Sequence, residues 1–312
     1  MAAAPHRIDV HHHISPPAYI AELDPKGIPL TRETREWTPA QSIELMDEGG
    51  VEVALTSITT PGLWFGDAAV SRRLARACND YAAKLVSDHP KRFGMFVNLP
   101  MPDVEGSLKE IEYGLDVLKA DGVVFFTSYG DKWLGDPAFD PVFEELHRRK
   151  ALVYTHPTTA TCCTNVLKVV NDSLIEYGTD TTRALAQMIL TGRSARFSDL
   201  NLIWSHGGGA MPFLIVRFMR VARAPHIARL LPQGFLHEAR RFYYDTAAIY
   251  DTGPLQALAK VVPVERILFG TDVPWGDPNE IATAVMDSGV FSPSDLKAID
   301  RDNALRLLPR YR

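Results

Sequence analysis

Short apolar segments alternate with amphipathic ones along nearly the whole chain, and this alternation constrains the fold more than any other feature. The apolar segments are rich in β-branched and aromatic residues, which is typical of buried strands. Between them, apolar residues recur at intervals of three and four, which predicts helices, for example over residues 69–89, 104–120 and 141–150. The predicted strands are residues 7–11, 51–58, 92–99, 122–126, 151–156, 201–206, 242–246 and 266–272.

Alternating strands and helices predict an α/β protein with a parallel sheet covered on both faces. Eight such units in 312 residues predict a closed (β/α)8 TIM barrel, and no linker or repeat divides residues 1–312, so we expect a single domain. An open doubly wound sheet is the alternative, although no glycine-rich phosphate-binding fingerprint follows the first strand. Residues 14–39 contain five prolines and predict an irregular insertion after strand one.

Charge and composition exclude several classes of protein. The 33 basic and 38 acidic residues leave a formal charge of -5, which disfavours a nucleic-acid partner. No window of 18 residues is uninterruptedly apolar and the N-terminal segment lacks a secretion-signal pattern, so we expect no membrane partner and a cytoplasmic location. Cys78, Cys162 and Cys163 have no metal-binding spacing and predict free thiols in a reducing compartment.

Histidines follow directly on the first predicted strand. Because side chains alternate along a strand, His11 and His13 are predicted to point to one side and His12 to the other. Barrel active sites lie at the carboxyl ends of the strands, so two imidazoles at such an end indicate a functional site. A truncated purification tag is the alternative, but a tag would not follow a strand-like RIDV segment.

Three further strands end in residues that can bind a metal or move a proton. His156 ends the fifth strand, His206 the sixth and Asp272 the eighth. Since the first and last strands of a closed barrel are neighbours, we expect His11, His13, His156 and Asp272 to meet. Imidazole nitrogens and a carboxylate suit Zn²⁺ or a related first-row ion. The alternatives are hydrogen-bonded interior histidines and an Asp272 that caps a helix.

His206 is the predicted acid/base residue beside that site, because an imidazole has a pKa near neutrality and can move a proton at cellular pH. Three glycines, residues 207–209, follow it. They predict positive φ angles and close backbone approach that would free space for a substrate, with a plain tight turn as the alternative.

The segments DVHHHISP, VYTHP, WSHGGG and GTDVPW together resemble the metal-site motifs of the amidohydrolase superfamily, in its aminocarboxymuconate-semialdehyde decarboxylase branch. The segments HHHISPP, SITTPG and HPTTA resemble its 6-methylsalicylate decarboxylase group. The resemblance covers all eight strands and implies a mononuclear site, with His11, His13, His156 and Asp272 as ligands and His206 as a catalytic residue. The fourth strand ends without a lysine, so the resemblance does not extend to a carbamate-bridged binuclear site.

The resemblance implies a carboxy-lyase that releases CO₂ from an aromatic or pseudo-aromatic acid such as an ortho-hydroxybenzoate. It further implies a homodimer and one divalent ion, Zn²⁺ before Mn²⁺, and no organic cofactor. Asp272 or His206 would protonate the carboxyl-bearing ring carbon, or His206 would act as base while hydroxide adds first. The alternatives are a hydrolase or hydratase acting on a lactone, amide or unsaturated acid, and a binding protein without catalysis.

Candidate substrate-binding residues lie in predicted loops at the open end of the barrel. The branch uses an arginine near a Trp-X-Pro segment to hold the substrate carboxylate, a role that suits the planar guanidinium. Arg32 and Arg35 are the candidates here, although exposed loop arginines are often only solvated. Aromatic side chains in the loops could form the walls of a flat pocket, with core packing as the alternative, and these are Trp37, Trp64, Phe65 and Trp275.

Overall fold

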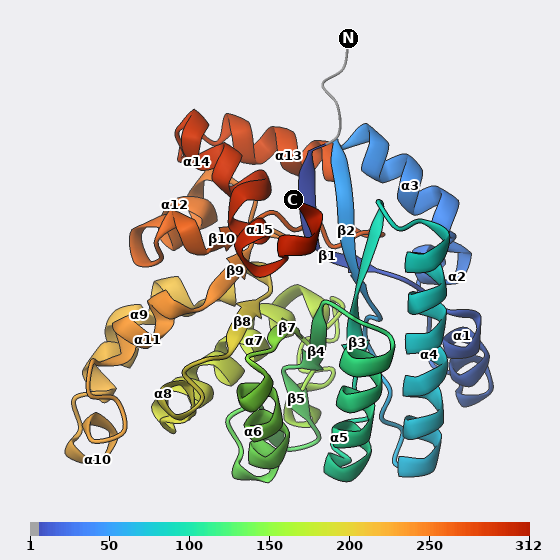
Figure 1. The fold of residues 1–312 in the computed structure, drawn as a ribbon. Coiled ribbons are helices and arrows are strands. Elements are labelled where there is room, and N and C mark those ends of the chain that lie inside the picture. The colour runs from blue at the N-terminus through green and yellow to red at the C-terminus, as the bar shows by residue number, and fades with distance from the viewer. Residues whose placement is uncertain (1–5) are drawn as a thin grey trace.

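The computed structural model describes residues 6–312 and contains one sheet of eight parallel strands surrounded by helices (Figure 1). Every predicted strand is present, with ends that differ by one to a few residues. In sheet order they are β1 Arg7–His13, β2 Val51–Ser57, β3 Phe93–Asn98, β4 Gly122–Phe126, β7 Leu152–His156, β8 Asn201–Trp204, β9 Tyr243–Asp245 and β10 Ile267–Leu268.

Backbone hydrogen bonds between β1 and the segment that begins with β10 close the sheet. The Val10 amide donates to the carbonyl of Phe269 at 3.0 Å, and the Asp272 amide donates to the carbonyl of His11 at 2.8 Å. Farther along, the His13 amide donates to the carbonyl of Val273 at 2.8 Å. The fold is therefore a (β/α)8 TIM barrel, and the open-sheet alternative is excluded.

Amphipathic helices cover the outside of the barrel. The longer ones are α3 Pro39–Glu48, α4 Ala68–Asp88, α5 Val104–Glu112, α6 Asp140–Arg149, α7 Ser173–Leu190, α9 Met211–Val221, α12 Thr252–Val261 and α13 Pro278–Asp287. The shorter helices are α8 Arg193–Arg196, α10 Pro225–Ala228, α11 Phe235–Arg241, α14 Pro293–Lys297 and α15 Asn303–Leu307.

The helix predicted over residues 104–120 is shorter than expected. Regular α5 ends at Glu112, and a wider π-type turn, η2 Tyr113–Val117, follows it. Gly114 lies in this turn against β3, where a Cβ atom would come within 2.2 Å of Val97 Cγ2. A short antiparallel hairpin that the sequence did not reveal, β5 Ser128–Tyr129 and β6 Lys132–Trp133, follows β4.

The prediction of an irregular segment over residues 14–39 was wrong. This segment contains α1 Pro17–Leu23, a 3₁₀ turn η1 Asp24–Lys26 and α2 Arg32–Glu36, and α3 begins at its last residue. The prolines predict a loop, but Pro17 begins α1, Pro39 begins α3 and Pro25 lies in the first turn of η1. In a first turn the missing amide of proline costs no hydrogen bond.

Apolar side chains fill the barrel interior at the amino-terminal ends of the strands. Ile8, Val53, Phe96 and Leu268 pack together there, and the C-terminal segment around α15 closes this end of the barrel. The second core layer lies between the strands and the outer helices. Because the amino-terminal end is filled, the barrel is left open to a ligand only at the carboxyl ends of the strands. No helix in residues 6–312 is both long and apolar enough to cross a membrane.

Candidate active site

The four predicted metal ligands meet at the carboxyl ends of β1, β7 and β10. One ligand atom each from His11, His13, His156 and Asp272 lies within 4.8 Å of all the others. The histidines are fully buried, and the Asp272 side chain keeps 21% of its exposure. His12 points away from the cluster, as its alternation with His11 and His13 predicted. Its Nε2 bonds to Ser42 Oγ of α3 at 2.8 Å, on the outer side of β1.

Hydrogen bonds outside the cluster fix how the imidazole rings are turned. His11 Nδ1 bonds to Asp245 Oδ2 at 2.9 Å, and His156 Nδ1 bonds to the Pro157 carbonyl at 2.8 Å. A carboxylate and a carbonyl can only accept, so both Nδ1 atoms carry the hydrogen. The Nε2 atoms therefore face the cluster, and each can present a lone pair to it when its ring is neutral. His13 Nδ1 similarly lies 3.3 Å from Ser57 Oγ.

The distances between the ligand atoms fit a single divalent ion. His11 Nε2, His13 Nε2 and Asp272 Oδ1 lie 3.1 Å from one another. Ligands at about 2.0–2.2 Å from a common ion are separated by roughly 3.0–3.5 Å. Within residues 6–312, Asp272 Oδ1 is buried beside two imidazole nitrogens at 3.1 Å but accepts no well-aligned hydrogen bond, and a buried carboxylate oxygen needs a cation beside it, either a protonated imidazole or a metal ion. The cluster therefore has the composition and spacing of a metal site.

The charges within the cluster keep most of the ligands in the form that binds a metal. Burial lowers the pKa of both His13 and His156, so these imidazoles are neutral at pH 7. Burial acts to raise the pKa of Asp272, but the neighbouring histidines outweigh it and hold that pKa well below its usual value. Burial also opposes protonation of His11, yet Asp272 and Asp245 raise its pKa to about 10. An ion must therefore displace a proton from His11.

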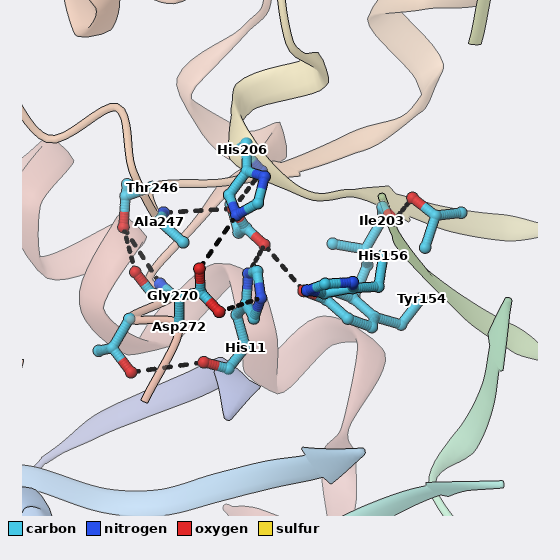
Figure 2. Close-up of polar contacts among 12 residues, drawn as sticks. His11, Tyr154, His156, Ile203, His206, Thr246, Ala247, Gly270 and Asp272 are labelled. Carbon is cyan, nitrogen blue, oxygen red and sulfur yellow. Dashed lines mark hydrogen bonds and ion pairs between the residues drawn. The ribbon is translucent and has the colours of Figure 1, made fainter. Parts of the chain in front are cut away.

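His206 lies beside this cluster, as predicted. Its Nε2 is 3.4 Å from Asp272 Oδ2, and its ring centroid is 5.1 Å from that of His11. Figure 2 shows the side chains of His11, His206 and Asp272 pointing toward one another. His206 and Asp272 both have positive φ angles, 52° and 65°, which is uncommon for residues other than glycine and typical of functional sites.

One alternative and one prediction for these residues do not hold. Asp272 is not a helix cap, because Asp277 supplies the carboxylate that caps α13. The glycines after His206 do have positive φ angles, but they do not free space for a substrate. A Cβ atom on Gly207 or Gly208 would meet Ile249 or Tyr244, and one on Gly209 would come within 2.0 Å of the Gly178 carbonyl. These glycines let the loop pack closely against α7 and β9.

Asp245 at the end of β9 is a functional candidate that the sequence reading missed. Its Oδ2 accepts from His11 Nδ1, and its Oδ1 accepts from the His206 amide at 2.8 Å. One buried carboxylate thus positions a metal ligand and the predicted acid/base residue together. The signal was available, because the seventh predicted strand ends in FYYDT with Asp245 at its carboxyl end, as Asp272 is in the eighth.

Asp9 of β1 also holds the backbone of the cluster in place. Its carboxylate accepts from the His11 amide at 2.9 Å, from Thr271 Oγ1 at 2.6 Å and from the Thr271 amide at 3.1 Å. It also bonds to His12 Nδ1 at 3.1 Å. Because Thr271 precedes Asp272, these bonds tie the backbone of two metal ligands together.

Of the four aromatic residues that were predicted to wall a substrate pocket, Trp275 packs against the cluster and Trp37 does not. The Trp275 ring packs edge-on against His13 with centroids 5.7 Å apart, and it keeps 41% of its exposure. Trp64 is also exposed, and Phe65 is partly buried with Lys26 over its ring. Trp37 instead joins the outer core, where its indole donates to Ser42 Oγ at 2.9 Å on the side of β1 that His12 faces. The structure therefore does not bring Trp37 to the cluster.

Both candidate arginines pair with acidic residues of their own segment. Arg32 Nε bonds to Glu36 at 2.7 Å and Arg35 to Asp24 at 2.8 Å, and both arginine side chains are exposed. Their role in holding a substrate carboxylate stays a prediction.

The family model described as amidohydrolase matches residues 8–310. The chain belongs to the amidohydrolase family. A fungal relative named decarboxylase yanB, from Aspergillus niger, is 37% identical over an alignment that covers 98% of this chain and 88% of the relative. The 6-methylsalicylic acid decarboxylase of Penicillium expansum is 32% identical, with 98% and 97% covered. The branch that the motifs of this amidohydrolase suggested is thereby confirmed.

Solved structures share the fold of this amidohydrolase. A crystal structure named amidohydrolase II has a TM-score of 0.90 at 24% identity and covers 97% of this chain and 99% of that one. The dihydroxybenzoic acid decarboxylase of Polaromonas, solved with manganese and the inhibitor 2-nitroresorcinol, has a TM-score of 0.84 at 22% identity and covers 98% of each chain.

Proposed function

We propose that this amidohydrolase is a metal-dependent, non-oxidative decarboxylase of a small aromatic acid of the ortho-hydroxybenzoate type, such as 6-methylsalicylate. The observation that carries the proposal is the cluster of three imidazole nitrogens and one carboxylate with His206 beside it. Relatives named decarboxylases match nearly the whole chain at 32–37% identity, which favours carboxyl loss over the hydrolase and hydratase alternatives.

In this proposal His11, His13, His156 and Asp272 hold one divalent ion, Zn²⁺ or Mn²⁺. When bound, the ion supplies a Lewis acid that neutralises and orients the carboxylate and ortho-oxygen of the substrate. The four side chains contribute a rigid frame, because each imidazole is buried and, through its Nδ1, hydrogen-bonded to or close to a residue outside the cluster. Trp275, Trp64 and Phe65 are proposed to border the aromatic ring.

His206 delivers a proton to the ring carbon that bears the carboxyl group, either directly or through Asp272, which is ionised and must first receive that proton from His206 at 3.4 Å. The bond between that carbon and the carboxyl carbon then breaks, its electron pair returns to the ring, and CO₂ leaves. His206 suits this role because its imidazole is about 8% exposed and so reaches the open side of the cluster. Asp245 holds the His206 backbone, which keeps the imidazole beside Asp272.

The deciding experiment measures CO₂ release from salicylate, 6-methylsalicylate and 2,6-dihydroxybenzoate, with protein reconstituted separately with Zn²⁺ and Mn²⁺. We expect CO₂ to appear in step with the loss of one of these acids and with one ion to support the faster turnover. Folded, metal-loaded protein that releases no CO₂ from any of them would contradict the proposal and favour lactone hydrolysis or hydration at the same site.

We further infer that the protein is a homodimer, and an exposed apolar surface supports this. Within residues 6–312, ten of the fourteen large hydrophobic side chains that are exposed lie between residues 166 and 230, and α7 packs against α9. A contiguous apolar surface above a few hundred Å² is typical of an interface, and C₂ dimers are the commonest oligomers. The ten are Val166, Leu167, Val169, Val170, Leu174, Ile175, Phe213, Val216, Val221 and Leu230.

Light scattering tests the dimer. The double substitution Phe213→Asp and Val216→Asp should yield monomers, whereas Val117→Asp, at an exposed position outside this surface, should leave the dimer intact. A wild-type protein that is monomeric at micromolar concentration would contradict the proposal.

We also propose a cytoplasmic location, because Cys78, Cys162 and Cys163 are all free, as in a reducing compartment.

A further inference from the structure

Tyr177 of α7 lies against the metal-ligand cluster. Its ring packs edge-on to the ring of His156, with centroids 6.0 Å apart. On the far side, its hydroxyl is 2.7 Å from Thr60 Oγ1 in the loop that follows β2. The pair thus links α7 to the loop that follows β2, next to a ligand of the proposed metal.

The two hydroxyls leave hydrogen-bonding capacity unused. Each carries one O–H, and only one O–H is consumed in the bond between them. Across residues 6–312, neither hydroxyl has another hydrogen-bond partner. Both residues are only partly buried, so the remaining O–H can donate to a ligand, and it belongs to Tyr177 when Thr60 is the donor within the pair.

Aromatic side chains lie close to this pair. Phe126 packs edge-on against His156 at 5.8 Å, and Gly62 leaves room for the Phe126 ring, which a Cβ at Gly62 would meet at 2.7 Å. A flat aromatic acid placed here would contact rings on its faces and edges. Oxygen atoms on its rim would need a donor, and the pair offers one.

We propose that Tyr177, oriented by Thr60, donates a hydrogen bond to an oxygen of the bound aromatic acid and so determines specificity. This inference rests on the proposed function for the class of ligand. Tyr177 is a specificity-determining residue in this account, and Thr60 is a positioning residue that acts through it.

The test compares Tyr177→Phe with wild type on salicylate, 6-methylsalicylate and 2,6-dihydroxybenzoate. Loss of one hydrogen bond to substrate predicts an increase in KM of about tenfold, with kcat changed less than threefold and the metal content unchanged. Thr60→Val should shift KM in the same direction by about threefold, because Tyr177 keeps its O–H but loses its orientation. An equal shift for all three acids assigns the contact to an oxygen that they share, and a larger shift for the dihydroxy acid assigns it to the second ring hydroxyl.

Tyr19→Phe is the matched control. The Tyr19 hydroxyl donates to the Thr59 carbonyl at 3.0 Å and accepts from the Gly62 amide at 3.1 Å, so it braces the same loop from a fully buried position. If Tyr177 acted only by bracing this loop, Tyr19→Phe would shift KM as well. We expect Tyr19→Phe to lower stability and to leave KM within twofold of wild type.

A binding measurement separates failure of this inference from failure of the proposed function. Calorimetry with Mn²⁺-loaded protein and 2-nitroresorcinol should give a dissociation constant about tenfold weaker for Tyr177→Phe, whether or not the wild type releases CO₂. Wild-type protein that binds without decarboxylating would overturn the proposed function alone. The role of Tyr177 would be overturned if wild type and Tyr177→Phe bound with equal affinity and, where CO₂ is released, had the same KM. It would also be overturned if the wild type did not bind 2-nitroresorcinol.

Discussion

At the scale of single residues, the two nitrogens of each ligand imidazole do different work. The Nε2 atoms of His11 and His156 face the cluster, while their Nδ1 atoms are held by Asp245 and by the Pro157 carbonyl. The sequence predicted the four ligands because each follows a recognisable strand. It did not predict their partners: the position of Asp245 at the end of a strand marks it as a candidate, but only the placement of β9 in the barrel shows that it bonds to His11.

His206 gives the most direct test of the proposed chemistry. We expect His206→Asn to lower turnover by about 10²–10⁴-fold, the usual range for loss of a general acid or base, because the amide cannot exchange a proton at neutral pH. Metal content should be unchanged, since His206 is not among the four clustered ligands. CO₂ release and metal analysis on the same sample measure both effects. Retention of near-full activity would remove His206 from the mechanism.

Asp245→Asn tests how the metal ligand His11 is oriented. Asp245 uses one oxygen for His11 Nδ1 and the other for the His206 and Ala247 amides. An amide side chain can accept on only one of these sides, so we expect metal affinity to fall by about 10–100-fold. Competition with a chelator measures it. Asp251→Asn, which alters the exposed cap of α12, is the control and should leave affinity unchanged. Equal affinities for the two variants would show that Asp245 does not orient His11.

At the scale of elements, the sequence predicted long helices well and short helices poorly. Helix α4 was predicted to within a residue, because its 21 residues repeat an apolar stripe. Helices α1 and α2 are seven and five residues long, too short for any periodicity to show. Their prolines then suggested a loop, although a proline in the first turn is compatible with a helix.

The start of α3 provides an element-scale prediction. Thr38 and Gln41 form a reciprocal capping box, and α3 carries the Ser42 that bonds to His12. Thr38→Ala should lower the free energy of unfolding by about 1 kcal/mol, since it leaves a helical amide without its acceptor. Urea denaturation measures the change, and Thr38→Ser should retain most of the stability. A Thr38→Ala variant as stable as wild type would mean that water replaces the cap at no cost.

At the scale of the whole molecule, the alternation of eight strands with helices was enough to predict the barrel. It was not enough to predict how the barrel closes, because β10 is only two residues long and its pairing with β1 depends on single hydrogen bonds from Val10, Asp272 and His13. The same bonds place Asp272 beside His11. The hydrogen bonds that close the barrel therefore also position the residues of the site. The single-domain organisation over residues 1–312 stays a prediction.

The closed end of the barrel should make stability depend on pH through Asp121. This carboxylate precedes β4, is almost fully buried, and joins the C-terminal residues Arg310, at 2.6 Å, and Tyr311 to the Met95 amide of β3. Burial raises the pKa of Asp121 from 3.8 to about 6, although Arg310 opposes the shift. Folding therefore favours the protonated form, and the stability that this form contributes is present below pH 4 and is lost as the pH rises through 6.

Asp121→Asn isolates this effect, because the amide stays neutral at every pH. Between pH 4.5 and 7.5 the free energy of unfolding of the wild type should fall by about 2 kcal/mol relative to that of the variant. Denaturant titrations of both proteins at the two pH values measure the difference, and the metal site, common to both, cancels from it. If the difference is constant, or if the wild type gains stability relative to Asp121→Asn as the pH rises, then the ion pair with Arg310 outweighs burial and the C-terminal segment is held to the barrel mainly by charge.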